Sequence, residues 1–252
     1  MVGRAMTSKL LGMLASPPAI CLLATVAAGF SAPAFAADLS AATVAATVLW
    51  YQEQEPGADS YPVKITITGD FMRIDAAEPE SGFILFDRGS HTIYSVSHDD
   101  RSILAVSAQP ADLDIPPAVR LDELVAQDPD APPINGRQPL HVQARADGKA
   151  CFEVIAVPGL LEPAVAALTD FARITGAQQA GHLKDMPAEI QTPCYLLRYV
   201  YGTGLPYQRG LPVREWDVYG YNRELNNYQH DMPVAAGLFE LPSGYQQYRI
   251  GD

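Results

Sequence analysis

Residues 62–106 read PVKITITGDFMRIDAAEPESGFILFDRGSHTIYSVSHDDRSILAV, and this stretch decides the fold class. At its start, Val63, Ile65 and Ile67 alternate with polar residues, a period of two that is typical of a half-buried β-strand. Further short apolar runs follow, separated by turn residues such as those at 69–70. Parallel neighbours would need a crossover of about a dozen residues or more. We therefore expect an antiparallel meander.

The acidic and imidazole side chains within this stretch raise the question of a catalytic or metal site. They are Asp87, His91, His98, Asp99 and Asp100. All of them lie in or beside the predicted turns DRGS and SHDDR, where Asp, Ser and Gly are favoured. A zinc site needs three or four convergent ligands, and the five histidines of the chain show no metal-binding spacing. We interpret these residues as turn residues and expect no metal.

Residues 1–36 have the pattern of a secretory signal peptide. Arg4 and Lys9 precede an apolar run over residues 19–30, and the small residues at 34–36 fit the A-x-A cleavage motif. The apolar run is shorter than the roughly 20 residues that span a bilayer. We predict a cleaved signal peptide and a periplasmic, non-membrane-spanning mature chain, which forms a single domain over residues 37–252.

Composition and motifs exclude several classes of function. Removal of residues 1–36, which hold two of the 17 Lys and Arg residues and none of the 29 Asp and Glu residues, leaves a formal net charge of −14. Nucleic acid is therefore not an expected partner, since phosphate binding needs basic clusters. The chain has no G-x-S-x-G motif and no Walker loop, and residues 202–204 (GTG) lack the third glycine of a dinucleotide site. We expect no catalytic residue and no cofactor, although carboxylates paired only in space remain open.

Cysteine usage predicts one disulfide bond. Cys21 lies within the predicted signal peptide, so the mature chain holds Cys151 and Cys194. In an oxidising compartment such a pair is expected to be joined. The bond would be worth about 4 kcal/mol in the loop-entropy model. A reactive thiol pair is the alternative, but the C-x-x-C spacing of redox motifs is absent.

Two segments have helical patterns. Residues 107–139 form a proline-rich arm, within which residues 118–127 (AVRLDELVAQ) space their apolar side chains as a short surface helix would. Residues 160–176 (LLEPAVAALTDFARITG) predict one long amphipathic helix, with Pro163 in its first turn and Gly176 as its stop. A single helix with one apolar face requires a sheet to cover it.

The C-terminal third is rich in tyrosine, with nine of the 12 tyrosines in the last sixty residues. Residues 194–202 (CYLLRYVYG) predict a strand, with Tyr199 and Tyr201 on one face and Leu196 and Val200 on the other. Such rings either line the core or form a concavity that offers an apolar body and polar tips to an amphipathic ligand.

The order of these elements resembles the half-open β-barrel superfamily of periplasmic lipoprotein carriers of the LolA/LolB type and its uncharacterised exported relatives. Residues 69–106 resemble the repeated pattern of that group, in which a strand with Arg and Asp residues is followed by a turn and another strand. Residues 237–245 (GLFELPSGY) are similar to the closing strand of those relatives. The resemblance implies a mainly β fold with one long helix (α+β), in which a curved antiparallel sheet or half-open β-barrel covers the helix.

This resemblance implies a non-enzymatic periplasmic protein that binds a hydrophobic or amphipathic ligand, such as an acyl chain or a lipoprotein, between sheet and helix. The candidate cavity residues are Ile65, Ile67, Phe83, Leu85, Ile93, Leu104, Leu196, Val200 and Trp216.

Two other functions remain open. One is an envelope protein whose tyrosine-rich face binds another protein, in which case Tyr199 and Trp216 would contribute to the interface. The other is an envelope hydrolase built from dispersed carboxylates. Recovery of one specific partner in a pulldown, lost on replacement of Tyr199 or Trp216, would indicate the first, and activity in a broad substrate screen would indicate the second.

Overall fold

The computed structural model describes residues 42–250, apart from residues 77, 79, 108–119 and 128–129. The described residues belong to one compact unit. The predicted signal peptide lies outside them, as does most of the proline-rich arm before residue 120. Within the described part of the chain, no helix combines the length and the apolar character that a membrane crossing requires.

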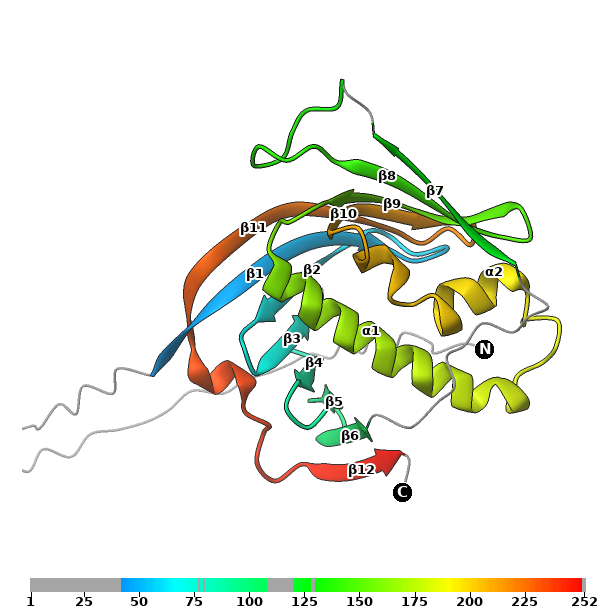
Figure 1. Cartoon of the computed structure of the whole chain (residues 1–252). Helices are drawn as coiled ribbons and strands as arrows, with labels where there is room; N and C mark the ends of the chain where they lie inside the picture. Colours follow the sequence, from blue (N-terminus) through cyan, green and yellow to red (C-terminus); the bar gives the residue numbers. More distant parts are fainter. Residues whose placement is uncertain (1–41, 77, 79, 108–119, 128–129, 251–252) are drawn as a thin grey trace, which may run out of the picture. The chain divides into compact units, whose positions relative to one another are not determined.

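The described chain is mainly β, with twelve strands in one sheet in the order β12-β6-β5-β4-β3-β2-β1-β11-β10-β9-β8-β7 (Figure 1). The strands are β1 (Thr43–Gln54), β2 (Tyr61–Ile67), β3 (Phe71–Asp75), β4 (Gly82–Asp87), β5 (Thr92–Ser97), β6 (Ser102–Ser107), β7 (Leu121–Gln127), β8 (Leu140–Ala146), β9 (Lys149–Val157), β10 (Leu211–Asp217), β11 (Asn222–Ala235) and β12 (Gln246–Ile250). Neighbouring strands are antiparallel except β12, which pairs in parallel with β6. The end strands β12 and β7 do not pair with each other, so the sheet is open.

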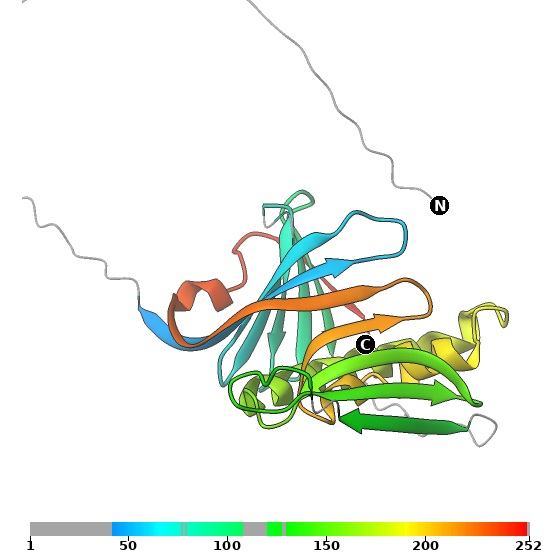
Figure 2. The ribbon, with the colours of Figure 1, turned by 90° about the horizontal axis from the view of Figure 1, so that it is seen from above.

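The helical elements are fewer and, with one exception, short. They are α1 (Glu162–His182), η1 (Leu183–Asp185), α2 (Pro193–Leu196), η2 (Leu197–Tyr201), η3 (Leu205–Tyr207) and η4 (Ala236–Phe239). Figures 1 and 2 show α1 lying along one face of the sheet.

The meander predicted from residues 62–106 is confirmed, as β2 to β6 pair consecutively and antiparallel. The interpretation of its charged residues as turn residues is confirmed as well. Asp87 accepts hydrogen bonds from the backbone N–H groups of Gly89 (2.9 Å) and Ser90 (3.1 Å). His91 and Arg101 adopt positive φ angles, 51° and 48°, as turn residues of this type do. These side chains therefore shape turns between strands.

The long helix is confirmed with Pro163 in its first turn, but its predicted end is wrong. Gly176 lies inside α1, which continues to His182. A Cβ atom on Gly176 would lie 2.7 Å from the carbonyl oxygen of Val200 and 2.6 Å from Oγ1 of Thr203. Glycine is needed here because η2 and the turn after it approach the helix closely, and not because the helix stops.

Each face of the central sheet has its own apolar core. On the α1 face, Ala167 and Leu168 of the helix belong to one buried cluster with Leu49 and Ile65 of the sheet. On the opposite face, the segment that follows β11 covers the strands, and Phe239 stacks on Phe71 with ring centroids 5.7 Å apart. The sheet between them is therefore covered on both sides.

The short helix predicted over residues 118–127 is wrong where the structure describes it. Leu121–Gln127 is the edge strand β7, and each of its seven residues has a partner in β8. Its apolar residues Leu124 and Val125 are 50% and 44% exposed. A strand ladder satisfies the backbone of this segment, whereas an isolated helix of about two turns is marginal in water.

The strand predicted over residues 194–202 is also wrong. Thr192 caps α2, as its Oγ1 accepts a hydrogen bond from the N–H group of Tyr195 (3.2 Å), and Pro193 occupies the first turn. The chain then continues as the π-helical segment η2. The predicted disulfide is confirmed, and it ties this helical region to β9 through Cys151 and Cys194.

Candidate functional site

A hollow of about 300 Å³ lies between the sheet and α1, and we call it the inner hollow. Alternation along β2 places Tyr61, Val63 and Ile65 on the face that it occupies. Its apolar lining consists of Val63, Ile65, Ile74, Ala76, Ile84, Leu168 and Phe171. Its polar lining consists of Glu53, Tyr61, Tyr207, Tyr221 and Arg223. The hollow therefore has an apolar body and a polar end.

Strand register builds the polar end. Arg223, near the start of β11, lies directly opposite Glu53 on β1 and directly opposite Glu215 on β10. The three side chains form a charged row across neighbouring strands, in which Arg223 is ion-paired to both acids. Opposite charges at directly paired positions stabilise a sheet.

Arg223 is the central side chain of this row, and only 8% of it is exposed. One guanidinium nitrogen lies 3.7 Å from Oε1 of Glu53, another forms a close ion pair with Glu215, and the group lies 4.5 Å from the ring centroid of Tyr51. Its Nε–H group has no hydrogen-bond partner among the described residues. Because this nitrogen has almost no accessible surface, its N–H group is enclosed by the protein and is one of the few buried donors without an acceptor.

A second ion-paired layer lies behind the row. Arg198 of η2 bonds Glu215 (3.2 Å) and lies 3.6 Å from Asp217. Asp217 also accepts a hydrogen bond from the hydroxyl group of Tyr199 (2.8 Å). Burial works to raise the pKa of Glu215, but Arg223 and Arg198 outweigh it and lower the pKa. Glu215 is therefore held as a carboxylate that is already shared between two guanidinium groups.

Glu53 differs from the other two acids because it lines the inner hollow itself. Its side chain is 15% exposed. Burial raises the pKa of Glu53, and the nearby charge of Glu215 adds to this, while Arg223 and a hydrogen bond from Tyr221 act in the opposite direction. The polar end thus presents the side chains of Glu53 and Arg223, which are paired with each other, to the hollow.

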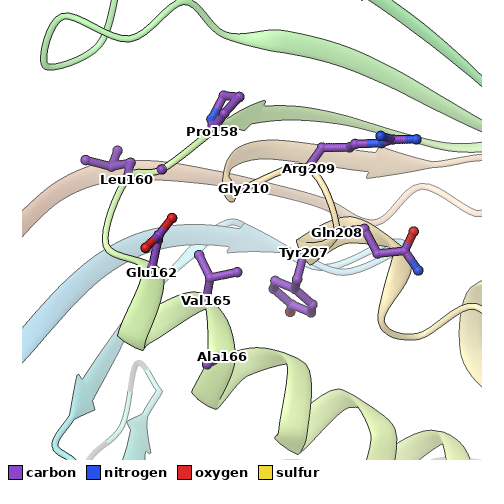
Figure 3. A pocket seen from close by; sticks show the side chains of 10 residues that line it. Pro158, Leu160, Glu162, Val165, Ala166, Tyr207, Gln208, Arg209 and Gly210 are labelled. Carbon is purple, nitrogen blue, oxygen red and sulfur yellow. The ribbon is translucent and has the colours of Figure 1, made fainter.

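A second hollow, of about 430 Å³, lies at the N-terminal end of α1. Figure 3 shows Glu162 and Val165 of the helix on one side of it and Gln208 and Arg209 on the other. Arg209 is already paired with Glu123 of β7.

The structure places the nine predicted cavity residues in different environments. Ile65 lines the inner hollow. Ile67 and Ile93 belong to the same buried cluster on the α1 face, and Leu104 lies on this face of β6 by alternation with Val106. These four residues share a face of the sheet.

The other five lie elsewhere. Phe83 and Leu85 are buried on the opposite face, beneath the C-terminal segment. Leu196 belongs to α2 and Val200 to η2, which contacts α1 through its backbone. Trp216 points to the outer face of β10, where its ring stacks on His141 at 5.8 Å.

The sequence reasoning missed the polar end of the hollow. A signal for Glu53 exists, because it continues the alternation of Leu49 and Tyr51 along β1 and so shares their face. For Arg223 the local signal is its position across the short β10–β11 turn from Glu215, but its pairing with Glu53 depends on a strand that is distant in the sequence. Among the described residues, no group of three or more His, Cys, Asp or Glu side chains is placed to hold a metal ion.

The tyrosines of the C-terminal third do not form a single face. Tyr207 and Tyr221 line the inner hollow. Tyr199 lies between Tyr195 and Tyr219, with ring centroids 5.2 and 6.0 Å away. These rings therefore lie in the hollow and in an outer row, and Tyr245 lies elsewhere, against His98.

Comparison with known proteins finds distant similarities in structure. The sequence matches no family model and no curated protein. An uncharacterized conserved protein from Thermus thermophilus is similar in structure, with 11% identity, a TM-score of 0.41, and coverage of 82% of this chain and 91% of that chain. PNGF-II is similar in two crystal forms, each with 9% identity and a TM-score of 0.40 over 82% of this chain. The match spans 31% and 32% of the PNGF-II chains, about a third of their length.

Proposed function

We propose that this protein is an exported, non-enzymatic binder of an amphipathic ligand, which it holds in the inner hollow. The observation that carries the proposal is an apolar hollow between sheet and helix that ends at Arg223 and Glu53. Small-molecule sites are concave and mostly apolar, with a few polar groups that fix the orientation of the ligand. The inner hollow likewise has a mostly apolar lining with its polar groups at one end.

The volume of the hollow limits the size of the ligand. About 300 Å³ is room for about ten groups of the size of a water molecule, at roughly 30 Å³ each. A tail of about ten carbons would gain up to about 8 kcal/mol on burial, at about 0.8 kcal/mol for each methylene group. Association itself costs at least about 4 kcal/mol. These figures leave at most about 4 kcal/mol from the tail, a dissociation constant of about 1 mM. We therefore expect a medium-length apolar tail, and any tighter binding has to come from contacts with the polar end.

The periplasm is the compartment that we propose. The signal-peptide pattern of residues 1–36 suggests export. The bond between Cys151 and Cys194 fits an oxidising compartment. An open sheet that passes over α1 is compatible with the half-open barrel of the lipoprotein carriers, so a lipoprotein acyl chain is one ligand of suitable chemistry.

Filling the hollow tests the proposal. Ile84→Trp adds bulk to its wall, and Ile190→Trp makes the same change at an exposed position away from it. We expect 1-decanoylglycerol to raise the melting temperature of the parent protein and of Ile190→Trp, but not that of Ile84→Trp, with circular dichroism as the control for folding. Equal responses from all three proteins, or none from the parent, would rule out binding in the hollow.

The outer row of tyrosines favours protein binding as a second candidate function. Tyr219 ends this row and is 38% exposed, and the adjacent Val218 is 58% exposed. Tyrosine provides a large contact area at low entropic cost. Capture of one envelope protein by the parent but not by Tyr219→Ala would support it. Equal capture by both would exclude this surface.

A further inference from the structure

We propose that a third hollow, on the face of the sheet opposite α1, is a second ligand site that takes a small anion with an apolar body. This hollow has a volume of about 550 Å³, and we call it the outer hollow. The side chains that define it are Trp50 of β1, Lys64 of β2, Arg73 and Asp75 of β3, Asn226 of β11 and Leu238 of η4. The inference does not depend on the proposed function, since the inner hollow lies on the α1 face.

Strand register places the polar side chains of the outer hollow next to one another. Lys64 lies directly opposite Trp50 on β1 and directly opposite Asp75 on β3. Alternation along β3 puts Arg73 on the same face as Asp75. Trp50 and Leu238 pack against the apolar cluster of this face, so the group lies on the side of the sheet away from α1.

One positive charge in this group has no close partner. Arg73 bonds Oδ1 of Asp75 through Nε at 2.9 Å and through a terminal nitrogen at 2.8 Å, and its remaining nitrogen donates to the carbonyl oxygen of Leu238 (2.8 Å). The charges of Arg73 and Asp75 therefore offset each other. The ammonium group of Lys64 lies 3.9 Å from Oδ2 of Asp75, which is longer than a hydrogen bond, and 42% of its side chain is exposed. An ammonium group has three donors, so Lys64 can bond an anion.

The other polar groups of the lining do not oppose an anion. Asn226 is exposed and offers both a donor and an acceptor. Tyr51 also lines the outer hollow, but its hydroxyl group donates to the carbonyl oxygen of Pro212 (2.9 Å) and belongs to the core on the α1 face. Asp75 is the one acid among the lining residues, against the two cations Lys64 and Arg73. The lining therefore carries a net charge of +1.

The rest of the molecule is acidic, with a formal net charge of −14 once residues 1–36 are removed. Charges separated by more than about 8 Å are largely screened at physiological ionic strength, so the groups near the hollow decide. Glu224 of β11 lies on the same face, but it is directly opposite Arg214 on β10, which offsets its charge. The apolar walls, which include Trp50, Pro62 and Leu238, suit an apolar body attached to the anionic group.

The test compares three ligands that share one phenylbutyl body, by isothermal titration calorimetry at neutral pH on the mature protein with its disulfide intact. The ligands are 4-phenylbutyrate, 4-phenylbutanol and 4-phenylbutylamine. We expect 4-phenylbutyrate to bind at least fivefold more tightly than the other two, a modest preference because Lys64 is partly exposed. Lys64→Met keeps most of the apolar stem and should abolish the preference, whereas Lys64→Arg should retain it. Lys184→Met removes the same charge at an exposed position of η1 and should leave the preference unchanged.

The outcomes also separate this site from the inner hollow. Equal binding of the three ligands, or no binding of 4-phenylbutyrate, would overturn the inference, as would an equal loss of preference in Lys64→Met and Lys184→Met. Ile84→Trp, which fills the inner hollow, should leave the binding of 4-phenylbutyrate unchanged. Loss of binding in this variant would place the anion in the inner hollow and overturn the inference, while the proposed function would stand. A failure of 1-decanoylglycerol to bind would overturn the proposed function and leave this inference intact.

Discussion

Two glycines of α1 provide a sharp test of how the helix packs. Gly176 is buried against η2, where an added Cβ atom would lie 2.7 Å from the carbonyl oxygen of Val200. Gly181 lies one and a half turns further along, and an added Cβ atom would meet nothing within 4 Å. Gly176→Ala and Gly181→Ala are therefore the same substitution in one helix. At residue 176 the added methyl group meets η2, and at residue 181 it meets no other atom within 4 Å.

The magnitudes follow from these two environments. Alanine is up to about 1 kcal/mol more favourable than glycine in a helix, and less near its end, so Gly181→Ala should stabilise the fold by about 0.5 kcal/mol. Gly176→Ala has the same gain, but overpacking against a fixed carbonyl group costs about 1–3 kcal/mol. The free energies of unfolding of the two variants should therefore differ by about 1–3 kcal/mol.

Urea unfolding, followed by circular dichroism, measures this difference. In thermal unfolding it corresponds to about 2–12 °C, at about 2–4 °C for each kcal/mol in a chain of this length. The slope of the unfolding free energy against urea should be the same in both variants, which shows that the denatured state is unaffected. If Gly176→Ala is as stable as Gly181→Ala, η2 does not pack against α1 as described.

Three further predictions concern the charged row and the disulfide. Glu215→Gln should lower the free energy of unfolding by about 3–5 kcal/mol in urea, because it leaves two buried guanidinium groups without their shared carboxylate; a loss below about 1 kcal/mol would contradict this. The pKa of Glu53 is raised, so the folded state holds its proton more tightly than the unfolded state does. The contribution of this proton to stability is present below the ordinary pKa of 4.5 and is lost as the pH rises through the pKa of the folded state. The parent should therefore lose stability relative to Glu53→Gln as the pH rises above about 4.5, and a constant or opposite difference in unfolding free energy would refute the assignment. Replacing Cys151 and Cys194 together with alanine should cost about 2–4 kcal/mol, and an unchanged urea midpoint would show that the bond does not contribute to stability.

Where local chemistry decides the structure, the sequence is sufficient. The alternation of Val63, Ile65 and Ile67 predicts β2, because period two fits one buried face of a strand whatever lies above it. Pro163 in the first turn of α1 is confirmed for a similar reason. The N–H groups of a first turn have no acceptor within the helix, so a proline, which lacks this group, loses no hydrogen bond there. The disulfide follows from cysteine count, because only one pair remains once the predicted signal peptide, with Cys21, is set aside.

Where contacts with a distant segment decide the secondary structure, the local sequence pattern predicts it wrongly. The spacing of Leu121, Leu124 and Val125 fits a helix, but pairing with β8 makes a strand of this segment, since a ladder gives its backbone partners that a lone helix would lack. Gly176 resembles a helix stop in sequence and is instead a point of close contact with η2. Neither outcome is encoded within a window of a few residues.

The sequence by itself therefore determined a mainly β chain with one long helix and one disulfide, because strand period, helix start and cysteine pairing depend on few residues. Only the tertiary structure decided where the hollow ends and what lines that end. Glu215 and Arg223 face each other across the β10–β11 hairpin, whereas Glu53 is far away in the chain and joins them because β1 and β11 are neighbours in register. A shift of one residue in either pairing would send the side chains to opposite faces of the sheet. Register depends on the packing of the whole sheet. It is the property that brings these three charged side chains together at the polar end of the inner hollow.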